Sequence, residues 1–121
     1  MIDVTIFFAY NLDMPLTTKL HPFDDETAKK TPSEAGAYEL LYKDTVVYIG
    51  SSGTSIRSRI CNHRKRKTFA KVTAFRYRKF EWAEDALDLE GKLCKSFKRK
   101  NGGKRPRLQQ RTPINRNLFD W

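Results

Sequence analysis

The segment GAYELLYKDTVVYIG, residues 36–50, has the composition and punctuation of a β-hairpin. Its two halves, residues 37–42 and 45–49, are rich in aromatic and β-branched side chains, which favour strands. Lys43-Asp44 interrupts the pattern between them, and the small residues from Gly50 to Gly53 close it. Two antiparallel strands are therefore expected here.

The sequence after the hairpin predicts a helix, a strand and a second helix. Ser55 is a suitable N-cap for a helix that continues to about Arg66. Residues 72–80 alternate as in a third strand, and residues 82–99 carry apolar side chains at the three-and-four spacing of an amphipathic helix. The order β-β-α-β-α predicts an α+β fold, with a small three-stranded antiparallel sheet flanked by helices.

The remaining segments are expected to be appendages of a single domain, because 121 residues are too few for a second sizeable core. Residues 1–35 are predicted to form an N-terminal arm without regular structure beyond residue 10, in which Asp3 to Ala9 would suit one extra edge strand. Residues 36–111 are expected to form the core of the domain. Residues 112–121 are predicted to form a C-terminal tail that docks on this core through its aromatic side chains.

Glu90 interrupts the apolar face of the second predicted helix. Apolar residues recur at positions 83, 86, 87, 93, 94 and 97, so the carboxylate stands in the middle of the same stripe. Such a charge needs compensation, either from a buried arginine in a structural pair or from a metal ion. On the first helix, Arg59 and His63 project from one face about one turn apart. Taken alone, His63 would be an ordinary packing or surface histidine.

The net charge of +10 is concentrated in the second half of the chain, since residues 57–121 hold 20 Lys and Arg against 6 Asp and Glu, whereas residues 1–56 hold 4 against 8. A basic excess attracts polyanions by releasing their condensed counterions, so DNA or RNA is the expected partner. No membrane partner is expected, because the basic run 64–67 lacks an apolar companion face.

The composition also indicates where in the cell the protein is expected. The longest apolar stretch near the start, residues 6–10, is far too short to cross a bilayer, and a cytoplasmic protein is expected. Cys61 and Cys94 have no partner at zinc-binding spacing and are interpreted as reduced packing residues. The sequence indicates no oligomeric state.

Five short motifs follow one another along the chain, namely Gly36-Ala37-Tyr38, Tyr48-Ile49-Gly50, Arg59, His63 and Glu90. In these residues, and in the hairpin and helices that carry them, the chain resembles the GIY-YIG nuclease superfamily over residues 36–109. The resemblance implies an endonuclease that hydrolyses phosphodiester bonds of double-stranded or branched DNA with the help of Mg²⁺ or Mn²⁺.

The resemblance also implies a role for each motif residue. Glu90 would hold the metal, Arg59 would face the non-bridging phosphate oxygens, and Tyr38 would accept a proton. Tyr48 would be the tyrosine of the second motif. His63 would be the partner of Arg59, or would itself take the proton or orient Tyr48.

Two departures from the superfamily pattern are present. Ala37 stands where Ile or Val is usual, which is a mild change. The asparagine expected after the second helix is absent, and Gln109 keeps an amide one methylene longer, with Asn115 as a second candidate if the loop is extended.

The length of the hairpin loop determines how Tyr38 and Tyr48 face each other. A three-residue loop, residues 42–44, places them directly opposite, whereas the two-residue loop Lys43-Asp44 sends them to opposite faces. Because the resemblance requires one shared cleft, it predicts the three-residue loop.

Around the cleft, basic side chains are predicted to follow the phosphate backbone. They are Arg57, Arg64, Lys65, Arg66, Lys67, Arg76, Arg78, Lys98, Arg99, Lys104, Arg105 and Arg107. Two alternatives to an active nuclease are a nucleic-acid-binding module of the same fold that has lost turnover, and a basic RNA- or ribosome-associated protein whose resemblance is accidental. The second alternative predicts no metal effect and no need for Glu90.

Overall fold

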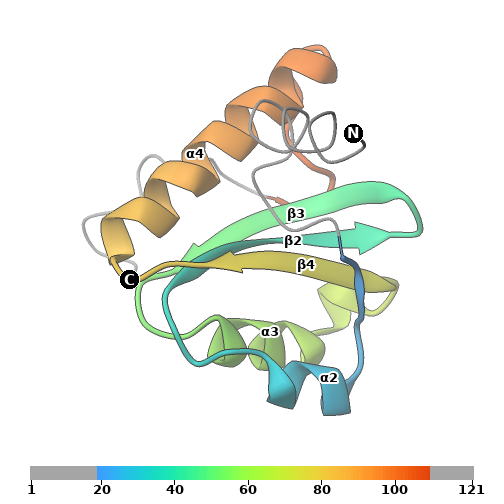
Figure 1. The fold of residues 1–121 in the computed structure, drawn as a ribbon. Coiled ribbons are helices and arrows are strands. Elements are labelled where there is room, and N and C mark those ends of the chain that lie inside the picture. The colour runs from blue at the N-terminus through green and yellow to red at the C-terminus, as the bar shows by residue number, and fades with distance from the viewer. Residues whose placement is uncertain (1–18, 110–121) are drawn as a thin grey trace, which may run out of the picture.

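The computed structural model describes residues 19–109, and an antiparallel sheet lies at its centre (Figure 1). The strands are β1 (His21–Pro22), β2 (Gly36–Tyr42), β3 (Thr45–Ser52) and β4 (Ala74–Lys79), in the spatial order β1-β4-β2-β3. The predicted α+β class, with helices flanking an antiparallel sheet, is confirmed. The predicted strand count of three was too low. The additional strand, β1, pairs with β4, and its proline fits an edge position because an edge strand leaves N–H groups unpaired.

The β2–β3 hairpin turns through the two residues Lys43 and Asp44, so the predicted three-residue loop is wrong. A β-bulge nevertheless brings Tyr38 and Tyr48 to the same face of the sheet. Leu40 pairs with Tyr48 and Leu41 pairs with Val46, which leaves Val47 as an extra residue between them. The extra residue shifts the register by one, so that Tyr38 lies opposite Gly50 and points to the same face as Tyr48.

Two helices cover the lower face of the sheet in Figure 1, α2 (Asp25–Lys30) and α3 (Ile56–Arg64), and α2 packs on α3. Ser55 caps α3 as predicted, because its hydroxyl accepts a hydrogen bond from the Ser58 N–H at 3.1 Å. The α2 helix was not predicted. Only six residues long, it has too few turns to show a helical period, although its cap, Asp24, accepts from the Thr27 N–H at 2.8 Å.

The opposite face of the sheet carries α4 (Ala83–Lys100), which lies across β2 and β3 (Figure 1). Its acidic first turn and basic last turn both complement the helix dipole. The sheet therefore separates two apolar cores. One core, around Ile60 and Phe75, lies under α3, and the other, around Ile49 and Leu93, lies under α4.

The two cysteines fit the packing role predicted for them, since Cys94 lies in one core and Cys61 packs beside the other. Within residues 19–109 no helix combines the length and apolarity needed to cross a bilayer. The predicted strand at residues 3–9, the docking of residues 112–121 and Asn115 fall outside the described residues.

Gly36 allows β2 to pack tightly against both β4 and α3. A Cβ at this position would lie 2.5 Å from the Arg78 carbonyl oxygen and 2.9 Å from Ile56 Cγ1. We expect Gly36→Ala to lower the free energy of unfolding by about 1–3 kcal/mol, the usual cost of overpacking. Urea unfolding measures this change. Gly91→Ala is the control, since nothing lies within 4 Å of its Cβ, and an equal midpoint shift in both variants would contradict the prediction.

Candidate functional site

Four consecutive residues of β3, from Tyr48 to Ser51, organise the site. Tyr48 contributes its own ring, the Ile49 N–H donates to Gln109, Gly50 receives the hydroxyl end of Tyr38, and Ser51 donates to Glu90. Alternation along the strand directs Tyr48 and Gly50 toward α3, and Ile49 and Ser51 toward α4. Residues far apart in sequence thus converge on one short stretch of strand.

On the α3 side, the rings of Tyr38, Tyr48, His63 and Phe69 form a contact cluster. The Tyr38 hydroxyl and His63 Nε2 are 2.7 Å apart, within hydrogen-bond distance. The His63 ring also meets the edge of Tyr48 at a centroid distance of 4.9 Å, and the two tyrosine rings stack at 6.3 Å. Tyr38 and His63 are buried, whereas Tyr48 is only half-buried. Of the two tyrosines, Tyr48 is therefore the one that a substrate can approach.

Gly50 is required by the close approach of these rings. A Cβ there would lie 2.6 Å from the Tyr38 hydroxyl oxygen and 2.9 Å from Tyr48 Cε2. We expect Gly50→Ala to displace both rings and to change the near-ultraviolet circular dichroism of the tyrosines, because the rings occupy the space that the added methyl group needs. An unchanged tyrosine signal would contradict this expectation, and Gly91→Ala again serves as the control.

On the α4 side, Glu90 is 1% exposed although it is a carboxylic acid. The Ser51 hydroxyl donates a hydrogen bond to Glu90 Oε1. The predicted position of Glu90, on the apolar face of its helix, is confirmed. Ser51 was not predicted, although the alternation of β3 directs it to the same face as Ile49, which packs under α4.

Arg59 and Gln109 lie at the borders of this arrangement. Arg59 is half-buried on α3, one turn before His63. Gln109 is buried at the outer edge of β3, where its Oε1 accepts a hydrogen bond from the Ile49 N–H at 2.9 Å. Gln109, one of the two candidates to replace the superfamily asparagine, is therefore bonded to the backbone of the segment Tyr48-Ile49-Gly50.

Among the basic residues predicted to bind nucleic acid, Arg57, Arg64 and Arg76 bond to other residues of the protein. Arg76 donates to the carboxylate of Glu39 at 2.7 Å, and both side chains are largely buried. Arg57 donates to the Thr31 carbonyl at 2.7 Å, and Arg64 donates to Asp25 and to the Phe23 carbonyl at 3.0 Å. These arginines stabilise the fold, whatever they bind in addition.

The other predicted basic residues lie at the surface in two groups. One group follows α3, with Lys65, Arg66 and Lys67 exposed and the Arg66 guanidinium 5.5 Å from the centre of the Phe69 ring. The other group surrounds the end of α4 and consists of Lys98, Arg99, Lys104, Arg105 and Arg107. Arg78 is exposed on β4, over the Phe80 ring.

Comparison with solved structures shows a likeness to the GIY-YIG N-terminal endonuclease domain of UvrC from Thermotoga maritima, bound to its catalytic divalent cation, magnesium. The TM-score is 0.58 at 18% identity, over 70% of this chain and 93% of that one. A point mutant of the same domain, also bound to the cation, matches with a TM-score of 0.58 at 17% identity, over 71% and 93% of the two chains. No protein-family model and no curated protein sequence matches this chain. The chain therefore has the GIY-YIG fold.

Proposed function

We propose that this chain, with the fold of a magnesium-bound endonuclease domain, is a divalent-metal-dependent endonuclease that hydrolyses phosphodiester bonds of DNA. The observation that carries the proposal is the buried Glu90 bonded to Ser51, on the strand β3 that carries Tyr48 and that the Tyr38 hydroxyl approaches at Gly50. Burying a carboxylate in an apolar helix face costs free energy unless a hydrogen-bond donor, a cation or a metal ion compensates for it. Such groups therefore gather at functional sites. The net charge of +10 favours a polyanionic substrate, which we propose to be double-stranded or branched DNA.

The residues at Glu90 fit a hard divalent cation. The Ser51 hydroxyl donates to Glu90 Oε1, and carboxylate oxygen is the ligand that Mg²⁺ and Mn²⁺ prefer. Among residues 19–109 there is no group of three or more His, Cys, Asp and Glu that could enclose a metal. One carboxylate is sufficient for a largely hydrated Mg²⁺ that also takes phosphate oxygens. When bound, the metal would stabilise the charge on the departing oxygen.

Arg59 is proposed to bind the non-bridging oxygens of the scissile phosphate. Its guanidinium offers a planar fork of donors, which matches two phosphate oxygens at once. Negative charge on those oxygens must be stabilised as the bond to water forms, so a donor already in position lowers the barrier. Because Arg59 is half-buried, part of its orientation is fixed before substrate arrives.

The proton of the attacking water needs an acceptor, and the structure favours Tyr48 over Tyr38 for direct contact. Tyr38 is completely buried and its hydroxyl lies 2.7 Å from His63 Nε2, whereas Tyr48 is half-buried at the same cluster. We therefore assign Tyr48 to the substrate side, and Tyr38 and His63 to the support beneath it. A phenol must have its pKa lowered by nearby cations before it accepts a proton at neutral pH, and Arg59 is the candidate on the adjacent helix.

A second candidate function is a nucleic-acid-binding module of the same fold without turnover. One observation favours it: the amide oxygen of Gln109 is already bonded to the Ile49 N–H. If the superfamily asparagine acts on the substrate, its replacement here has a structural task instead. Both functions predict DNA binding, and only the first predicts cleavage.

The test is cleavage of supercoiled plasmid, of branched DNA and of single-stranded RNA, each with Mg²⁺, with Mn²⁺ and with EDTA. We expect nicked or linear DNA products that appear only with metal. Tight DNA binding with no product from any substrate would establish the binding module. Cleavage that persists in EDTA would contradict the metal-dependent mechanism.

A further inference from the structure

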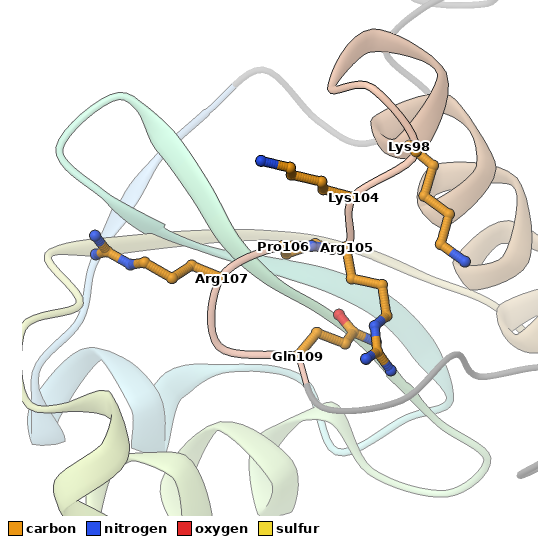
Figure 2. A pocket seen from close by; sticks show the side chains of 7 residues that line it. Lys98, Lys104, Arg105, Pro106, Arg107 and Gln109 are labelled. Carbon is orange, nitrogen blue, oxygen red and sulfur yellow. The ribbon is translucent and has the colours of Figure 1, made fainter.

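A pocket of about 440 Å³ lies between the C-terminal end of α4 and the segment that follows it (Figure 2). Four of the residues that line it are cationic, namely Lys98, Lys104, Arg105 and Arg107. No acidic side chain from residues 19–109 lines it. The pocket is therefore concave, and the charged side chains that line it are all cationic.

The segment that forms the pocket is held at both ends. At the α4 end, the Gly103 N–H donates to the Lys98 carbonyl at 2.7 Å, and Gly102 and Gly103 adopt the positive φ values, 65° and 83°, that such a helix end requires. At the other end, the Leu108 N–H donates to the Val47 carbonyl at 2.8 Å and Gln109 accepts from the Ile49 N–H. The backbone beneath the cations is thus attached to both α4 and β3.

The chemistry of the lining selects an anion with several acceptor atoms. Lysine and arginine side chains only donate hydrogen bonds. Because Oε1 of Gln109 faces the Ile49 N–H, the part of this amide that remains for a ligand is the donor Nε2. Figure 2 shows Lys98, Arg105 and Gln109 extending toward the same part of the pocket, whereas Lys104 and Arg107 extend away from it. A phosphate group, with three accessible oxygens and negative charge, fits such donors.

We propose that this pocket binds a backbone phosphate of the nucleic acid next to the one that is cut, with Lys98 and Arg105 as positioning residues. The inference rests on the proposed function for the substrate strand. The location follows from Gln109, which lines the pocket and bonds Ile49, the residue between Tyr48 and Gly50 of the candidate site. A phosphate bound here determines where the nucleic-acid strand crosses β3, and it takes no part in the chemical step.

The experiment measures binding of a DNA duplex as a function of salt concentration, in a Glu90→Gln background and in EDTA, so that no cleavage interferes. For the double variant Lys98→Ala with Arg105→Ala, we expect the slope of log K against log salt to become shallower by about 0.9, because the two side chains together neutralise one phosphate. This corresponds to an affinity loss on the order of tenfold for the double variant at 0.1 M salt. The matched control is Lys71→Ala with Lys92→Ala, which removes the same charge from exposed positions outside the pocket.

The outcomes separate this inference from the proposed function. One outcome is that the wild type does not cleave, but the pocket variant makes the slope of log K against log salt shallower than the control does. The pocket is then a phosphate-binding site and the nuclease proposal fails. If the wild type cleaves and the pocket variant matches the control, the pocket assignment is overturned. In the active protein the pocket variant should raise KM and leave kcat unchanged, because it removes binding shared by ground state and transition state. Binding of inorganic phosphate is measured as well. If the pocket variant loses binding of free phosphate but keeps the wild-type salt dependence of duplex binding, the assignment is also overturned.

Discussion

Glu90→Gln should abolish metal-dependent cleavage while leaving DNA binding intact. The substitution keeps the shape of a side chain that is 1% exposed, but it removes the negative charge that would hold the cation. A bound metal contributes several kcal/mol to stabilising transition-state charge, so we expect the rate to fall by about 10³-fold or more. Single-turnover cleavage of plasmid DNA measures the loss, and a mobility-shift titration measures binding.

The control for this variant is Asp88→Asn, which removes one negative charge from an exposed position of the same helix. We expect it to cleave as the wild type does. Thermal unfolding of both variants shows whether the Ser51 contact to position 90 still supports the fold. A folded Glu90→Gln protein that cleaves at a rate close to that of the wild type would contradict the assignment of Glu90 as the metal ligand.

Arg59→Lys should lower the cleavage rate by about 10²–10³-fold although the charge is kept. Lysine is a point charge and cannot present two parallel donors to the phosphate oxygens, and loss of one preorganised donor usually costs this much. The effect should appear mainly in kcat, because the interaction strengthens as charge develops in the transition state. Steady-state kinetics on a short duplex distinguishes kcat from KM.

Arg99→Lys is the corresponding control, since Arg99 is exposed near the end of α4. It should change neither parameter by more than about twofold, because the charge is retained at an exposed position. An Arg59→Lys variant with a raised KM and an unchanged kcat would show that Arg59 only binds the DNA. Another residue would then have to stabilise the transition-state charge on the phosphate oxygens.

Much of the fold could be predicted because its elements follow local rules. The hairpin composition, the Ser55 cap and the apolar stripe of α4 each depend on residues close in sequence, and the structure contains all three elements. The strand β1 and the helix α2 could not be found in this way. They are two and six residues long, too short for a period, and their stability comes from packing on β4 and α3.

The features of the candidate site also fall into those that local sequence determines and those that depend on tertiary contacts. The sequence by itself determined which residues are unusual, such as a glutamate in an apolar stripe and two tyrosines beside glycines, because residue type and spacing are local properties. Only the tertiary structure decided how they meet. The Val47 bulge, which depends on the pairing of two strands, brings Tyr38 and Tyr48 to one face despite the two-residue loop. The hydrogen bond from Ser51 to Glu90 joins residues 39 apart, and Gln109 reaches Ile49 across 60. Contacts at such separations depend on the position of the backbone in space, which local spacing does not specify.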